Sequence, residues 1–175
     1  MSDVVLSIDP GLRVVGCAVF VDRRLVRCDV VECDYGYGVE QRIEMARAIR
    51  TWYETTCLDE HGEPTDVVIE EMQVRRGNDS QRNKRRGDVD GDLIKLSHVT
   101  GAAWREFDES NPIAAPAGTW TKGRKKPVNH RRILKRLDPP EEQVLEAGLA
   151  DALKDNHKEI LDAVGIGLWH IGRLS

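Results

Sequence analysis

No stretch of this sequence approaches the roughly 20 consecutive apolar residues that a membrane-spanning helix needs, and its first residues lack the pattern of a signal peptide. We therefore expect a cytoplasmic protein that makes no membrane contact. Cysteine is also scarce: the 4 cysteines form no C-x-x-C pair, and no histidine stands near them at zinc-finger spacing. These absences exclude a disulfide framework and a structural zinc site.

The chain also has no overall positive charge: its formal net charge is −4 and its pI is about 5.8. Taken alone, this charge argues against a polyanionic partner. The distribution argues the other way, since basic residues are concentrated in two segments. These contain Arg75, Arg76, Arg82, Lys84, Arg85 and Arg86 in the first, and Lys122, Arg124, Lys125, Lys126 and Arg131 in the second. Either segment alone is typical of a solvated face, whereas two segments beside buried acids favour a nucleic-acid partner.

The chain of 175 residues suits one domain over residues 1–175, organised around its first apolar run. Residues 4–8 are almost all aliphatic, which predicts a strand that is buried on both faces. Asp9 ends this strand, and Pro10-Gly11 forces a turn directly after it. Asp9 alone is compatible with a simple turn-opening role, so its function depends on further acids nearby.

The segments after this turn predict an α/β fold with a mixed sheet. Residues 14–20 and 25–32 are the next strands, and their short connections predict a three-stranded antiparallel meander. Apolar residues at helical spacing predict a helix over 39–55, before a polar turn at 59–65. A short buried strand at 66–71 follows. Because it comes after a helical crossover, it should lie parallel to the first strand and bring Glu70 or Glu71 beside Asp9.

The remaining segments complete the sheet and its helical cover. Residues 73–91 are polar and basic, which predicts a loop, and 93–107 carry an apolar stripe that predicts a helix. A short strand is expected at 113–115. A basic helix follows and ends at Pro139-Pro140, and another helix starts at Glu141.

The last predicted helix, residues 157–169, is apolar all round except for Asp162. A carboxylate in a helix that packs on every side is costly unless it is paired or bound to a metal. Glu159 lies three residues earlier, on nearly the same face. An alternative for Glu159 is a capping box with Asn156 at the start of this helix.

If Asp9, Glu70, Glu159 and Asp162 meet at one edge of the sheet, their mutual repulsion requires divalent cations. Hard oxygen ligands favour Mg²⁺ or Mn²⁺. Two such ions about 3.5 to 4 Å apart can activate a water and stabilise the leaving oxygen of a phosphodiester. The basic segments would then hold the phosphates that flank the scissile bond.

Four motifs in this order resemble those of the RuvC-type Holliday junction resolvases. They are Ser-Ile-Asp-Pro-Gly-Leu-Arg-Val-Val-Gly at 7–16, Val-Ile-Glu at 68–70, Lys-Leu-Ser-His-Val-Thr-Gly at 95–101 and His-x-Glu-x-x-Asp-Ala at 157–163. The resemblance implies an RNase H-like fold, in which a five-stranded mixed sheet of a meander plus two parallel strands is flanked by helices. It also implies a homodimer, dimerised through the helix at 93–107, that makes paired Mg²⁺-dependent nicks in four-way DNA junctions.

The resemblance assigns the catalytic and metal-binding roles to Asp9, Glu70, Glu159 and Asp162, and so selects Glu70 over Glu71. The family often has aspartate or histidine at the position of Glu159. It commonly has a base-stacking aromatic where this chain has Gln73, which implies that the basic loop holds DNA backbone instead. This loop, with Trp120 before the second basic segment, looks more like phage-borne relatives, which would act in a host cytosol, than like the bacterial housekeeping enzyme.

Three other functions compete with junction resolution. One is a broader debranching nuclease for forks and flaps, and another is a junction-binding protein without catalysis. The third is an actin-like or sugar-kinase ATPase, which would need two duplicated domains. A second Asp-x-Gly-x-x-Thr motif is absent from the sequence, so we expect no nucleotide cofactor.

Overall fold

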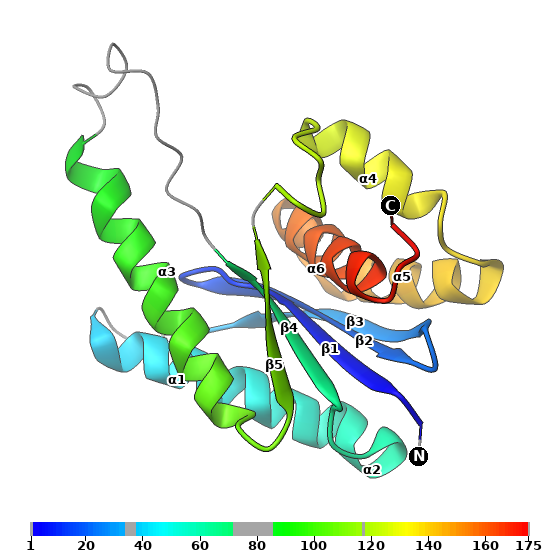
Figure 1. Ribbon diagram of the computed structural model, residues 1–175, viewed down its shortest axis with the longest axis horizontal. Helices are drawn as coiled ribbons and strands as arrows, with labels where there is room; N and C mark the ends of the chain where they lie inside the picture. The colour runs from blue at the N-terminus through cyan, green and yellow to red at the C-terminus, as the bar shows by residue number, and fades with distance from the viewer. Residues whose placement is uncertain (1, 34–37, 72–85, 117, 175) are drawn as a thin grey trace.

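A five-stranded mixed sheet with strand order β3-β2-β1-β4-β5 forms the centre of the structure. The computed structural model describes residues 2–33, 38–71, 86–116 and 118–174, with the backbone alone for 86–93 (Figure 1). The strands are β1 (Val4–Asp9), β2 (Val14–Val21), β3 (Arg24–Glu32), β4 (Asp66–Glu71) and β5 (Asn111–Pro116). The first three form an antiparallel meander, whereas β4 pairs in parallel with β1, and β5 in parallel with β4. The predicted sheet is confirmed.

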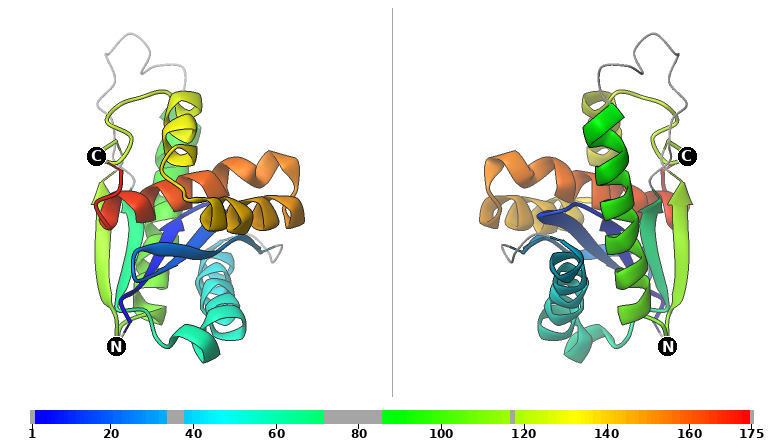
Figure 2. Two further views of the ribbon diagram at one scale, coloured as in Figure 1. Left: turned by 90° about the vertical axis from the view of Figure 1, so that its right-hand side faces the viewer. Right: turned by 90° about the vertical axis from the view of Figure 1, so that its left-hand side faces the viewer.

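Helices cover both faces of this sheet (Figures 1 and 2). One face carries α1 (Val39–Tyr53) and α3 (Arg86–Glu106), and the other carries α4 (Lys126–Leu134), α5 (Pro139–Asp151) and α6 (His157–His170). Shorter helical turns are η1 (Glu54–Leu58), α2 (Asp59–His61) and η2 (Lys154–Asn156). Within the described part of the chain, no helix combines the length and the apolar character needed to cross a membrane.

The alternation of side chains along β1 divides the core into two layers. Val4, Leu6 and Ile8 belong to the cluster under α1 and α3, while Val5 belongs to the cluster under α6. Ser7 also faces α6, because its hydroxyl donates to the carbonyl oxygen of Ala163 at 2.9 Å. Since successive side chains of a strand point to opposite faces, Asp9 lies on the α6 side with Val5 and Ser7.

Three predicted boundaries were wrong. The first helix continues through η1 and α2 to His61, so the predicted polar turn begins later than residue 59. Helix α3 begins at Arg86 instead of 93, which places 86–91 in a helix; the rest of the predicted basic loop, 73–85, lies outside the described residues. Helix α5 begins at Pro139, because proline fits the first turn of a helix, where its missing N–H has no partner.

Candidate metal centre

Asp9 and Glu70 meet at one end of the sheet because β1 and β4 are parallel. Ile8 pairs with Ile69, so Asp9 and Glu70 are the next residues of the two strands. Val68 packs in the cluster under α6, and the alternation of side chains therefore puts Glu70 on the same face as Asp9. Glu71 is exposed and belongs to the opposite face. The structure thus gives a physical reason for choosing Glu70 over Glu71.

Helix α6 brings Glu159 and Asp162 to the same point. It crosses β2 very closely, since a Cβ atom added at Gly16 would lie 2.0 Å from the carbonyl oxygen of Glu159. Gly16 is the residue that pairs with Asp9 across the β1–β2 ladder. This close approach leaves carboxylate oxygens of Asp9, Glu159 and Asp162 within 4.8 Å of one another.

The capping-box alternative for Glu159 has no support in the structure. Asn156 makes no side-chain capping hydrogen bond at the start of α6, and its amide instead donates to Glu32 Oε1 at 2.7 Å. A capping box does occur elsewhere, between Asp138 and Glu141 at the start of α5. Glu159 is therefore available to the acidic cluster.

Burial and mutual repulsion disfavour ionisation of the strand acids. Asp9 is only 8% exposed. Burial raises the pKa of Asp9 well above its ordinary range, and the three neighbouring carboxylates, led by Glu70, raise it further. Burial also raises the pKa of Glu70, although a hydrogen bond from Trp120 opposes the shift. In the absence of a cation, this end of the sheet favours retained protons on Asp9 and Glu70.

Asp162 is the exception, because two basic side chains of α4 contact it. Lys126 Nζ lies 2.5 Å from Oδ2 of Asp162, and His130 Nε2 lies 2.8 Å from Oδ1. Burial alone would raise the pKa of Asp162, but the hydrogen bonds from His130 and Lys126 lower it. The sequence reasoning placed Lys126 among DNA contacts and did not single out His130. Their spacing of four residues on one helix was the available signal.

Trp120 was also missed as part of this site. The indole Nε1 donates a hydrogen bond of 2.8 Å to Glu70 Oε1, and the tryptophan is 3% exposed. The sequence suggested no contact for this residue, because it follows β5 by a few positions in an irregular segment.

The donor set fits a small divalent cation. The converging groups are carboxylates, they lie close enough to share an ion, and hard oxygen ligands of this kind suit Mg²⁺ or Mn²⁺ better than thiolate-seeking metals. Asp9, Glu159 and Asp162 could hold such an ion, with Glu70 beside Asp9 as a further ligand. A metal at this point would also relieve the repulsion that raises the pKa of Asp9.

Only part of the predicted DNA-binding set falls on described residues. Arg75, Arg76, Arg82, Lys84 and Arg85 lie outside them, and Arg86 is the first residue of α3. In the second segment, Lys122, Arg124, Lys125 and Arg131 are exposed on α4 and the turn before it. Lys126 belongs to the same segment but its ammonium group contacts Asp162. The second basic segment therefore borders the carboxylates directly.

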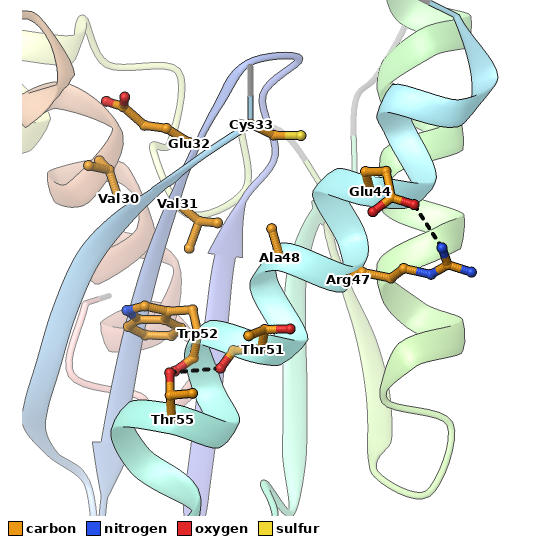
Figure 3. Close-up of a pocket in the computed structure, with 10 residues that line it drawn as sticks. All are labelled: Val30, Val31, Glu32, Cys33, Glu44, Arg47, Ala48, Thr51, Trp52 and Thr55. Carbon is orange, nitrogen blue, oxygen red and sulfur yellow. Dashed lines mark hydrogen bonds and ion pairs between the residues drawn. The ribbon is translucent and has the colours of Figure 1, made fainter. Parts of the chain in front are cut away.

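A hollow of the described surface lies on the other side of the sheet, between β3 and α1 (Figure 3). Its volume is about 620 Å³, and Val31, Ala48 and Trp52 form much of its apolar wall. Glu44 and Arg47 pair with each other at 2.7 Å at its rim. Glu32, the other charged residue of the lining, accepts a hydrogen bond from Asn156, so this hollow offers no cluster comparable to the carboxylates.

The chain is similar to known proteins in its structure but not detectably in its sequence. No model of a protein family matches the sequence, and no curated protein is detectably similar to it. One similar solved structure is RuvC of Thermus thermophilus in complex with Holliday junction substrate, with a TM-score of 0.52 and 16% identity over 97% of this chain and 96% of that one. Another is a structure of Thermus thermophilus RuvC, with a TM-score of 0.52 and 20% identity over 96% and 93%. The chain therefore has the fold of RuvC, as the four sequence motifs predicted.

Proposed function

We propose that this protein is a single-domain, structure-selective DNA endonuclease that resolves Holliday (four-way) junctions by paired symmetric nicks. Its role would lie in recombination, repair or processing of branched DNA. One observation carries the proposal: carboxylates from β1 and α6 converge within 4.8 Å on a fold similar to RuvC. Glu70 adds a fourth acid beside Asp9. The RuvC structure that was solved with a junction supports branched DNA as the substrate class.

The site residues divide the chemical work between them. Asp9, Glu70, Glu159 and Asp162 would hold two Mg²⁺ or Mn²⁺ ions, which supply an activated water and charge stabilisation at the leaving oxygen. The carboxylates would fix where a phosphodiester can bind, because the phosphate would be held by the ions that they bind. Lys126, which contacts Asp162, could donate to a phosphate oxygen once it leaves that carboxylate.

The basic segment at the start of α4 would give the DNA a path to the acids. Lys122, Arg124 and Lys125 are exposed in the turn before α4 and Arg131 on α4 itself, and each can neutralise a backbone phosphate. Contacts of this type carry no base preference and weaken as salt rises. We therefore expect binding to branched DNA that decreases steeply with ionic strength.

A homodimer would provide the second cut that resolution requires. Helix α3 has an exposed stripe of Ile94, His98, Gly101 and Arg105, in which Ile94 is 59% exposed. A Cβ atom added at Gly101 would meet nothing within 4 Å, so a second helix could approach closely there. The Gly101→Arg variant tests this assignment by sedimentation. We expect a monomer that retains its fold, and an unchanged dimer would refute the use of α3.

Cleavage of a panel of labelled DNAs tests the activity itself. Four-way junctions, forks, flaps and linear duplex are incubated with Mg²⁺, and the nick positions are mapped. We expect symmetric nicks confined to the four-way junction. Equal cutting of forks and flaps would support the broader debranching nuclease, and tight junction binding without cleavage would support the binding protein. Cutting of linear duplex at the same rate would exclude resolution.

A further inference from the structure

Trp120 contacts the acidic cluster through Glu70 but supplies no carboxylate to it. Its indole Nε1 donates to Glu70 Oε1 at 2.8 Å, and 3% of the residue is exposed. An indole has a single donor and no acceptor, so Trp120 cannot act as a metal ligand or a base. Its role toward Glu70 is therefore restricted to orientation and to stabilising the charged carboxylate.

The same indole packs in one apolar cluster with residues of the two helices that carry Asp162 and His130. A Cβ atom added at Gly165 would lie 2.7 Å from Cζ3 of Trp120 and 2.7 Å from Cδ1 of Ile133. Gly165 lies three residues after Asp162 on α6, and Ile133 lies three residues after His130 on α4. Residues at this spacing are neighbours on one helical face. The ring is thus wedged between the elements that supply Glu70, Asp162 and His130.

Glu70 needs such a support because the strand fixes its backbone but not its long side chain. It is the penultimate residue of β4, where the ladder to β1 has ended at Ile69 and pairing with Ala115 of β5 continues. Glutamate has three rotatable side-chain bonds, and orienting it costs conformational entropy. Groups that hold metal ligands by hydrogen bonds typically change metal affinity or activity by 10- to 100-fold when they are removed.

We infer that Trp120 is a positioning residue that holds Glu70 in place for a divalent cation and couples it to α6 and α4. The inference rests on the proposed function for the identity of the ligand, since it assigns Glu70 to the metal site. It predicts that the N–H group of Trp120, beyond the bulk of its ring, contributes to metal affinity.

Binding of Mn²⁺ to the full-length protein, measured by titration calorimetry without DNA, tests this inference. The Trp120→Phe variant keeps an aromatic ring and loses the N–H donor. We expect its Mn²⁺ affinity to fall roughly tenfold. The control is Trp52→Phe, which removes an indole that donates to Asp29 at 3.4 Å on the α1 side of the sheet. This control should bind Mn²⁺ as the wild type does.

A double-mutant cycle with Glu70→Ala, which removes the acceptor of the indole N–H, separates positioning from general packing. If Trp120 acts through Glu70, Trp120→Phe has no further effect on Mn²⁺ affinity in the Glu70→Ala background. An equal loss in both backgrounds, or an unchanged affinity in the single variant, would overturn the inference. If Trp120→Phe does not fold, replacement of Trp120 by benzothienylalanine keeps the shape of the indole without its N–H, and the same outcomes apply.

The binding measurement also distinguishes this inference from the proposed function. If the Mn²⁺ affinities of the wild type and the variants follow the expected cycle but the wild type cleaves no branched DNA, the nuclease is refuted and the role of Trp120 stands. Junction cleavage with an unaffected Trp120→Phe affinity would refute the positioning role alone. Absence of any Mn²⁺ binding by the wild type would overturn the inference as well.

Discussion

Two sites bury carboxylates on the α6 side of the sheet, and they are built in opposite ways. Glu141 of α5 is 3% exposed, and fixed donors surround both of its oxygens. Arg173 contacts Oε1 at 2.6 Å and Oε2 at 2.7 Å. The backbone N–H groups of Leu25 and Asp138 each add a hydrogen bond of 2.8 Å. Asp9, 8% exposed, instead faces other carboxylates.

The pKa values of the two acids move in opposite directions. Burial alone would raise the pKa of Glu141, but Arg173 and the two backbone donors lower it. Burial raises the pKa of Asp9, and its acidic neighbours add to the effect. A buried acid whose donors are all supplied by the chain is part of the scaffold. One that is surrounded by further acids is a site that an external cation must complete.

The largest effect should come from removing a carboxylate of the cluster. Asp9→Asn is expected to lower junction cleavage by on the order of 10³-fold, because the charge stabilisation that a metal supplies amounts to several kcal/mol. The same variant should raise the unfolding midpoint of the metal-free protein by a few degrees, since it removes a carboxylate that resists ionisation. Single-turnover cleavage and thermal unfolding in EDTA measure the two effects.

Glu71→Gln is the matched control, because it changes an exposed acid beside Glu70 on the opposite face of β4. This variant should cleave junctions and unfold as the wild type does. Cleavage by Asp9→Asn at the wild-type rate would remove Asp9 from the site.

Arg173→Ala tests the scaffold carboxylate Glu141. In contrast to Asp9→Asn, it should lower stability and leave the cleavage rate almost unchanged. The change leaves Glu141 buried without its guanidinium partner, which is expected to reduce the free energy of unfolding by about 3 kcal/mol. The cleavage rate of the remaining folded protein should stay within about twofold, because Arg173 contacts none of the four acids. Urea unfolding at neutral pH measures the loss, and a loss below about 1 kcal/mol would contradict the description of this pair.

The strand acids and the fold could be predicted because local patterns encode them. A buried strand that ends in Asp9, a second that ends at Glu70, and one acid in the apolar last helix each give a signal within a few residues. The parallel pairing of β1 and β4 then follows from the helical crossover. The choice of Glu70 over Glu71 follows from the alternation along β4 once its buried face is known.

The partners of those acids could not be predicted, because they depend on how helices pack. Lys126 reaches Asp162 over 36 positions of sequence, and Trp120 reaches Glu70 over 50. The basic segment offers many equivalent cations, and no periodicity tells which of them will point inward. That is decided by the contact of α4 with α6. The start of α5 was misjudged for a simpler reason, since Pro139-Pro140 was read as a helix end and is a helix start.

A smaller effect, on Mn²⁺ affinity, is expected from Lys126→Met. This change removes a cation that pairs with an acid of the cluster, as Arg173 pairs with Glu141 in the scaffold site. Lys126 donates to Asp162 as Arg173 does to Glu141, so it must be displaced before a metal can use that oxygen. Removing it should raise the Mn²⁺ affinity a few-fold, because a competing cation is lost and the net negative charge of the site grows. Titration calorimetry measures the change.

Lys135→Met is the control for Lys126→Met, since it removes an equal charge from the exposed end of α4. Its Mn²⁺ affinity should change less than twofold. A lower affinity in Lys126→Met would show that the ammonium group supports the metal ligands instead of competing for them.

The smallest expected effect is a difference in how stability depends on pH. The pKa of Asp9 in the folded state lies well above its ordinary value of 3.8. As pH rises, the unfolded state therefore releases this proton before the folded state does. Stability of the metal-free protein should therefore fall as pH rises above about 4. The pKa of Glu141 is lowered from 4.5, so its contribution is complete above that pH and is lost as pH falls through the folded value.

Urea unfolding between pH 3 and 8 gives the free energy of unfolding as a function of pH. Its upper limb is the fall above about pH 4 that is due to Asp9, and its lower limb is the fall toward acid pH that is due to Glu141. Asp9→Asn should flatten the upper limb, since the titrating group is gone, and saturating Mg²⁺ should flatten or reverse it, because the ion favours the ionised carboxylate. Glu141→Gln should flatten only the lower limb. If Asp9→Asn leaves the upper limb unchanged in EDTA, the repulsion within the cluster is too weak to require a cation. The physical contrast between the two buried sites would then be wrong.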